Sequence, residues 1–116
     1  MGAFKSDDLA GFWIKATVSA GVPTNAASFN VGSITDTGLG ILTVTLTTAF
    51  STANWCCQCA AELTATTYAV ANARRTNIRN AAQAAGSVAI DCIDNTATTN
   101  LAADPTAWHV AGWGTQ

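Results

Sequence analysis

One nearly uncharged stretch, SITDTGLGILTVTLTTAF at residues 33–50, decides the fold that we expect for this chain. It contains a single ionisable side chain, an aspartate. Its threonines alternate with Leu42, Val44 and Leu46, which is the two-residue period of a strand with one face on a core. The glycines of the preceding segment, DTGLG, permit a tight reversal of the chain. We therefore predict a hairpin whose outer face is a row of uncharged hydroxyl groups.

Strand-like segments recur on both sides of this hairpin. Together with it they cover residues 12–18, 28–34, 41–48, 55–66, 86–93 and 106–113. Pro23, which has no N–H to donate, supports a turn at residues 20–25. Residues 67–85 are rich in alanine but show no clean helical stripe, so we expect a loop or an irregular strand there. The pattern predicts an all-β protein, an antiparallel β-sandwich or jelly-roll-like domain over residues 12–116.

The alternation also predicts which side chains share a face. The expected groups are Phe12, Ile14, Ala16 and Val18; Trp55, Cys57, Cys59, Ala61 and Leu63; Val88, Ile90 and Cys92; and Trp108 with Val110. The group that begins at Val88 is expected in the core. Residues 1–11 contain charged side chains and end at a glycine, so we expect an N-terminal arm ahead of the domain.

The chain is unusually low in charge. Charged residues make up 10% of it, against roughly 25% in an ordinary soluble domain. The net charge of −2 argues against a nucleic-acid partner, which normally requires a basic excess. Two acids interrupt the first eighteen residues, and no apolar run approaches a membrane span. We therefore expect no membrane partner and synthesis in a cytoplasm.

The aliphatic content predicts self-association. Leu, Ile, Val and Phe account for 23 of 116 residues, close to the lower limit for an autonomous core. Ordering a chain costs about 1.5 kcal/mol per residue, which so light a core hardly offsets alone. Low charge and four tryptophans are also typical of buried subunit surface. We therefore expect a homo-oligomer rather than a monomer that is merely rich in alanine and threonine.

The four cysteines do not form a metal-binding pattern. Cys56, Cys57 and Cys59 lie in the segment CCQC, which is not a CxxC pair, and Cys92 stands apart. A structural zinc site usually presents two ligand pairs at two-residue spacing. We expect no metal and no cofactor, and small buried side chains instead. A disulfide between Cys92 and either Cys57 or Cys59 stays open if their strands are neighbours, although cytoplasmic assembly favours reduced thiols.

Residues for catalysis are equally sparse. His109 is the only histidine, and no G-x-S-x-G or H-E-x-x-H segment accompanies it, so we interpret it as an interface or edge residue. Asp91 and Asp94 are three residues apart on a strand, which places them on opposite faces and weakens a shared acid–base role. We therefore expect no catalytic residues and no enzyme.

One basic cluster remains, in the segment ARRTNIRN. It holds Arg74, Arg75 and Arg79, three of the five basic residues. Arginine pairs with carboxylates through two parallel hydrogen bonds, so a docking patch for a partner and a solvated loop are both consistent with it.

Three segments carry a resemblance to a known family. They read FWIKATVSAG, ASFNVGSITDTGLGILTVTLTTAFSTANW and AADPTAWHVAGWGTQ. They resemble a small β-sandwich module of tailed-phage structural proteins, common in marine phages and found in head fibres, tail fibres and other virion proteins. The S-F-N-V-x-S-I-T-D-x-G-x-G hairpin is its most distinctive part. The resemblance covers residues 12–60 and 103–116, while CCQC and ARRTNIRN depart from the family pattern.

This resemblance implies a function on a virus particle. A tail fibre carries a long shaft or an attachment domain, and only about eleven residues precede the module here. We therefore expect a capsid decoration, or cement, protein on the virion surface, assembled in the host cytoplasm. It would form a trimer with copies of itself and bind the major capsid protein or another virion protein, and so stabilise the shell. The alternative is a tail-fibre or spike tip that recognises the host surface, for example a glycan.

Candidate partner-binding residues follow from this expectation. They are Lys5, Asp7 and Asp8 of the arm, the arginines Arg74, Arg75 and Arg79, and the aromatic residues Trp108 and Trp113. The arm and the arginines are the expected shell contacts. The two tryptophans would stack on sugars or fill the interface between subunits.

Overall fold

The computed structural model describes residues 10–67, 69, 72–94 and 101–116, and all of its regular elements are strands. They are β1 (Phe12–Ser19), β2 (Val22–Phe29), β3 (Val31–Gly38), β4 (Ile41–Leu46), β5 (Cys56–Ala61), β6 (Arg74–Ala84), β7 (Ser87–Asp94), β8 (Leu101–Ala102) and β9 (Ala107–Trp113). The predicted arm falls on residues 1–11, of which 1–9 lie outside the described residues. The all-β prediction is confirmed.

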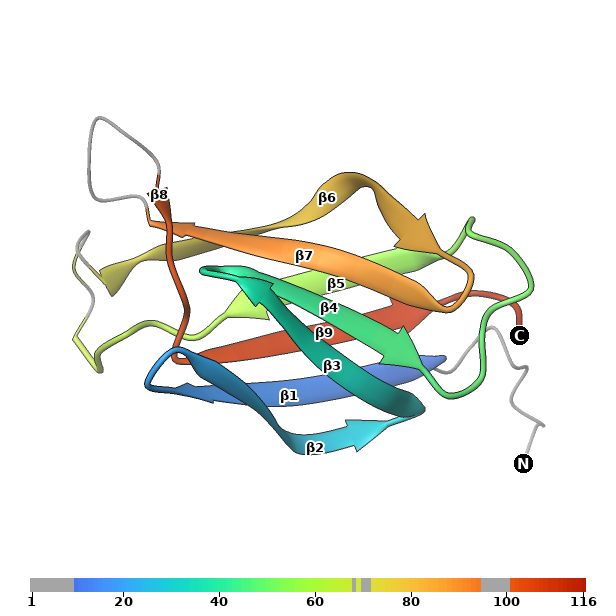
Figure 1. The fold of residues 1–116 in the computed structure, drawn as a ribbon, viewed down its shortest axis with the longest axis horizontal. Coiled ribbons are helices and arrows are strands. Elements are labelled where there is room, and N and C mark those ends of the chain that lie inside the picture. The colour runs from blue at the N-terminus through green and yellow to red at the C-terminus, as the bar shows by residue number, and fades with distance from the viewer. Residues whose placement is uncertain (1–9, 68, 70–71, 95–100) are drawn as a thin grey trace, which may run out of the picture.

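The strands form two antiparallel sheets that lie one over the other (Figure 1). The first sheet has the order β2-β1-β9-β5, and the second has the order β3-β4-β7-β6 with β8 paired to β7. Strands that follow one another in sequence often lie in different sheets, as β4 and β5 do. This arrangement is a β-sandwich, which confirms that form of the predicted fold.

The predicted hairpin is confirmed as β3 and β4. Val44 lies opposite Ile34, and Thr43 lies opposite Thr35. The side chains of Leu42, Val44 and Leu46 are buried, so the threonines between them face outward from the second sheet. The outer face of this hairpin is therefore uncharged and lined with hydroxyl groups.

Two predicted boundaries between residues 20 and 34 are wrong. The chain reverses at Ala20 and Gly21, and β2 then contains Pro23, which pairs with β1. Proline is tolerated there because β2 is an edge strand. The single strand predicted at 28–34 is instead broken at Asn30, whose φ of 55° turns the chain from the first sheet into the second.

The segment predicted as a loop or irregular strand contains β6, an edge strand of the second sheet. Its register against β7 shifts between Ile78 and Gln83, and Ala81 has a φ of 56° within this bulge. The strand predicted over 55–66 is shorter than expected, because β5 ends at Ala61.

The core lies between the two sheets and has an aromatic cluster at one end. Phe50 stacks on Trp55 with ring centroids 4.7 Å apart, and Phe12 meets Trp55 edge-on at 5.5 Å. Trp55 also donates its indole N–H to the carbonyl of Ala84 at 2.8 Å, so its polar atom is satisfied. A side chain at Gly112 would meet the rings of Phe12 and Trp55, which explains glycine in the middle of β9.

Hydrogen bonds join distant segments at the opposite end of the sandwich. The carboxylate of Asp104 accepts a hydrogen bond from the N–H of Gly40 at 2.7 Å. Gly40 in turn accepts one from the N–H of Cys92 at 2.7 Å, and Ala103 donates to the carbonyl of Cys92 at 3.1 Å. The hairpin tip is thus fixed to β7 and to the segment before β9.

Candidate binding surfaces

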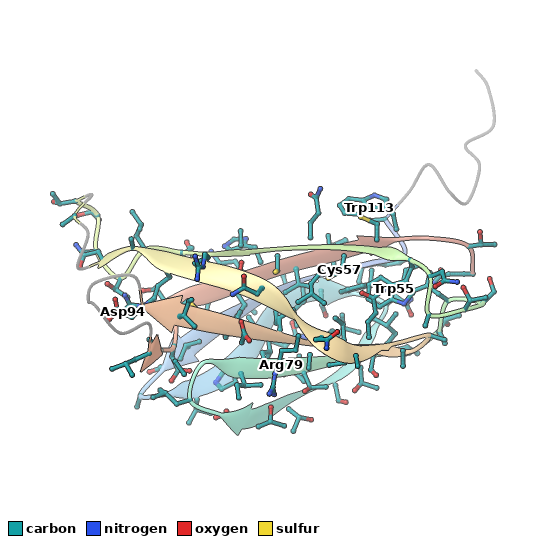
Figure 2. All side chains as sticks on the ribbon, turned by 90° about the horizontal axis from the view of Figure 1, so that it is seen from above. Trp55, Cys57, Arg79, Asp94 and Trp113 are labelled. Carbon is teal, nitrogen blue, oxygen red and sulfur yellow. The ribbon has the colours of Figure 1, made fainter. Side chains whose placement is uncertain are left out.

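The outer face of the first sheet carries three aromatic side chains. In the antiparallel register Trp13 of β1 lies opposite Phe29 of β2 and Ala111 of β9. Opposite residues share a face, so Phe29 and Trp13 lie side by side, 55% and 44% exposed. Trp113, two residues beyond Ala111, lies on the same outer side, whereas Trp55 lies between the sheets (Figure 2).

A shallow groove of about 480 Å³ lies on this face, and both Trp13 and Trp113 line it. Ala60 and Ala111 add small side chains to its lining, so the indole rings stand above their surroundings. Gln58 is exposed in the groove, and its amide makes no hydrogen bond to any residue that the structure describes. The groove therefore combines apolar rings with a free donor and acceptor.

Three polar side chains, Glu62, Lys15 and His109, lie close together beside the groove on the outer face of the first sheet. The Glu62 Oε2 atom lies 3.5 Å from Lys15 Nζ and 3.5 Å from His109 Nε2. All three side chains are 41–45% exposed, so the Lys15–Glu62 ion pair contributes less than about 1 kcal/mol to stability, and the contact with His109 is an ion pair only when the imidazole is protonated. His109 lies on β9, a central strand, so of the two predicted roles the edge position is wrong and the interface role stays a prediction.

The predicted arginine cluster is divided between two environments. Arg74 is largely buried, lies 3.8 Å from Asp94 Oδ1 and donates to the carbonyl of Asp104 at 3.5 Å. Arg75 and Arg79 are exposed on the edge strand β6. Arg74 therefore has a structural role within the fold, and only the other two arginines of the cluster present a free surface.

The placement of Trp108 corrects one candidate, and three others are not described. Trp108 is 1% exposed and belongs to the core between the sheets, so its ring is not available for stacking on a partner. The cause is its place on the inward face of β9, together with Val110. Trp113 is partly exposed, as its predicted role requires. Lys5, Asp7 and Asp8 lie outside the described residues.

The four cysteines are free, and they differ in environment. Cys56 is exposed, whereas Cys57 and Cys92 are buried. The strands β5 and β7 belong to different sheets, so the neighbouring-strand arrangement that would favour a disulfide with Cys92 is not found. Burial, reinforced by Cys59 and Cys56, raises the pKa of Cys57 from 9.0 to about 12. Burial also raises the pKa of Cys92 to about 11, partly opposed by Arg74.

These two thiols predict a loss of stability at alkaline pH. The unfolded chain releases their protons near pH 9 and the folded chain does not, so the unfolded state binds fewer protons and stability falls as pH rises from 9 towards 11 or 12. Each thiol contributes a loss of roughly 1 kcal/mol per pH unit in that window. Urea unfolding at pH 8 and pH 10 measures it. The variant Cys57→Ala with Cys92→Ala should lose less stability between these pH values, and an equal loss in both proteins would contradict the assignment.

Other chemistry has little support among the described residues. No group of three or more His, Cys, Asp or Glu side chains is gathered there in a way that could hold a metal ion. Asp91 accepts a hydrogen bond from Asn77 at 3.1 Å, while Asp94 pairs with Arg74, so the two carboxylates have different partners. Within the same part of the chain, no helix is long and apolar enough to cross a membrane.

A second surface, the apolar end, is defined by Val22, Leu39, Leu63 and Leu101. The β1–β2 turn, the β3–β4 turn, β8 and the segment after β5 all lie toward the same end of the sandwich (Figure 1). The four side chains belong to these segments and are 58%, 63%, 37% and 63% exposed, respectively. Exposed aliphatic side chains in segments at one end of a domain are consistent with a surface that a partner covers.

The fold and its surfaces define an all-β sandwich domain with two candidate binding surfaces. No protein-family model, no curated protein and no solved structure matches the chain.

From the sequence, Trp113 of the groove was a binding candidate, but neither the rest of the groove nor the apolar end was identified. Alternation places Trp13 on the strand face opposite Phe12 and Ile14, but Phe29 beside it and Gln58 in the groove come from other strands. Their adjacency depends on the order β2-β1-β9-β5, which no local pattern reveals. The aliphatic residues of the apolar end lie in turns and short segments, where a sequence pattern assigns no face.

Proposed function

We propose that this chain is a non-enzymatic structural protein of a tailed-phage particle, a decoration protein on the capsid surface. It associates with copies of itself, as a trimer, and binds the major capsid protein or another virion protein. The apolar end is the observation that carries the proposal. Four exposed aliphatic side chains belong to segments at that end (Figure 1), on a chain of which only 10% is charged.

The energetics of association favour the apolar end as the contact between subunits. Burying apolar surface stabilises a complex by about 25 cal/mol per Å² before the costs of association. Interface cores are depleted in charge, and Val22, Leu39, Leu63 and Leu101 are uncharged.

The residues of the family resemblance support the proposal in a second way. Asn30 of the segment SFNV turns the chain between the sheets, and Gly40 and Asp104 fasten the hairpin to the segment before β9. The resembling segments thus supply the positions on which the sandwich depends. A related phage module would need the same residues for the same physical reasons.

The remaining surface suits a particle exposed to varying salt. The outer face of β3 and β4 is lined with threonine hydroxyls, which hydrate without a charge that salt can screen. The exposed guanidinium groups of Arg75 and Arg79 are the proposed contacts to acidic groups of the shell. The shell-binding roles of Lys5, Asp7 and Asp8 remain proposals of the same kind.

If the apolar end is the contact between subunits, the protein should have the mass of a trimer at all micromolar concentrations. We expect Leu39→Asp and Leu101→Asp to dissociate it, because each places a carboxylate in an apolar contact. Both side chains are 63% exposed in the single chain, so the fold should tolerate the changes. Sedimentation equilibrium measures the mass, and circular dichroism checks the fold.

The matched control for this experiment is Ala53→Asp. Ala53 is exposed in the loop between β4 and β5, at the other end of the sandwich (Figure 1), and should leave the trimer intact. A monomeric wild-type protein would remove the trimer from the proposal. The virion assignment is tested separately by mass spectrometry of purified particles of the source phage, and absence of the chain from them would overturn it.

A further inference from the structure

We propose that the groove between Trp13 and Trp113 binds a neutral oligosaccharide. This site goes beyond the decoration role, since it lies on the outer face of the first sheet and not at the apolar end. The polypeptide brings it together from three strands, with Trp13 on β1, Trp113 on β9 and Gln58 on β5.

The aromatic rings suit the apolar faces of sugar rings. Phe29 and Trp13 are adjacent across β2 and β1, and Trp113 lies diagonally across β9 from Trp13. Diagonal neighbours on a sheet are about 7–8 Å apart, within reach of large side chains. Tryptophan offers a large rigid surface with little conformational entropy to lose on binding. The three rings therefore lie on one face of three neighbouring strands, with Trp13 and Trp113 in the groove and Phe29 beside it, where successive sugar units can stack.

The polar groups suit the hydroxyl groups at the edges of those rings. The amide of Gln58 has both a donor and an acceptor without a partner among the described residues. Glu62 accepts, and Lys15 donates, at the border of the groove. Vicinal hydroxyls both donate and accept, so they can bind such a mixed set. The groove volume of about 480 Å³ lies in the range of small-molecule sites.

The charges of the groove select against other occupants. The Glu62 carboxylate lies 3.5 Å from both Lys15 Nζ and His109 Nε2, so it offsets the positive charge at this border of the groove and leaves little to attract a phosphate, a nucleic acid or an acidic glycan. A second protein copy would bury these ionic groups together with Gln58, and their desolvation would cost free energy. An uncharged polyol leaves the ion pair at the edge of the groove in water. The complementary ligand is therefore neutral and rich in hydroxyl groups.

A glycan array containing neutral and acidic oligosaccharides is the first experiment. We expect binding only among neutral hexose oligomers of three or more units. The strongest binder is then titrated by tryptophan fluorescence at 50 and 300 mM salt. Affinity should be the same at both concentrations, whereas a ligand held by its charge would bind more weakly at the higher one. Binding confined to acidic glycans, or none at all, overturns the proposal.

Variants locate the site. Trp13→Ala and Trp113→Ala should each weaken binding about tenfold or more, and Gln58→Ala several-fold. Ile78→Ala is the matched control, since Ile78 is 40% exposed on β6 of the other sheet and should bind normally. Thermal unfolding of each variant shows that the fold is retained. Unchanged affinity in both tryptophan variants overturns the site.

The same variants distinguish a contact between copies from a sugar site. If Trp13→Ala lowers the mass of the assembly and the wild type binds no sugar, the face is a subunit interface and the glycan proposal is wrong. If Trp13→Ala abolishes sugar binding at unchanged mass, the proposal holds whether or not the chain is found in phage particles.

Discussion

Replacing Gly40 with alanine is expected to lower the free energy of unfolding by about 4 kcal/mol. Gly40 has a φ of 67°, a conformation that costs any residue with a Cβ atom. The added Cβ would also lie 2.6 Å from the carbonyl oxygen of Cys92 and 2.8 Å from the amide nitrogen of Ala103. Both contacts are with backbone, so relief requires movement of the segments that hold the hairpin tip.

Chemical denaturation of Gly40→Ala against the wild type measures this loss. The matched control is Gly32→Ala, at an exposed position of β3 where the nearest atom, Thr47 Oγ1, would lie at 3.4 Å. We expect the control to lie within about 0.5 kcal/mol of the wild type. A Gly40→Ala protein as stable as the control would show that the close approach of the hairpin to β7 is absent in solution.

The second large effect is expected at Asn30. Its side-chain Nδ2 donates to the carbonyls of Gly11 at 2.8 Å and Thr48 at 2.9 Å, and its Oδ1 accepts from the N–H of Thr48 at 2.7 Å. Its φ of 55° adds a preference for asparagine over other residues with a side chain. We expect Asn30→Ala to cost about 3 kcal/mol, from lost hydrogen bonds and backbone strain together.

A second substitution separates these two contributions. Asn30→Gly removes the hydrogen bonds and relieves the strain, so it should cost about 1 kcal/mol less than Asn30→Ala. Asn25→Ala is the control, because Asn25 makes a single exposed hydrogen bond to Ser28 and its loss should be small. If alanine and glycine at position 30 proved equally destabilising, the left-handed backbone would have no part in the corner.

These two residues show where sequence reasoning worked and where it did not. The glycines before β4 correctly predicted a reversal, because a positive φ is a local property of a turn. The contact of Gly40 with Cys92 and Ala103 was not predictable, because it joins residues far apart in the chain. Asn30 was placed inside a strand, since an asparagine between Phe29 and Val31 carries no local sign of a corner between sheets.

The tryptophans illustrate the same division at the candidate sites. Trp13 and Trp108 both lie on alternating strands, and the pattern assigns each to one of two faces. Only the packing of the second sheet decides which face becomes the core, and it buries Trp108 while leaving Trp13 44% exposed. The expectation that Trp108 binds a partner was therefore wrong, and the exposure of Trp13 beside Phe29 was not predicted.

By itself, the sequence determined the all-β class, the central hairpin and the alternation of faces along most strands. These follow from side-chain period and turn chemistry, which act over a few residues. Only the tertiary structure decided the order of strands in each sheet, the corner at Asn30, the groove with its indole rings and the grouping of aliphatic side chains at one end. Those features depend on which strands pair across long separations, and pairing is settled by the burial of the whole core rather than by any single segment.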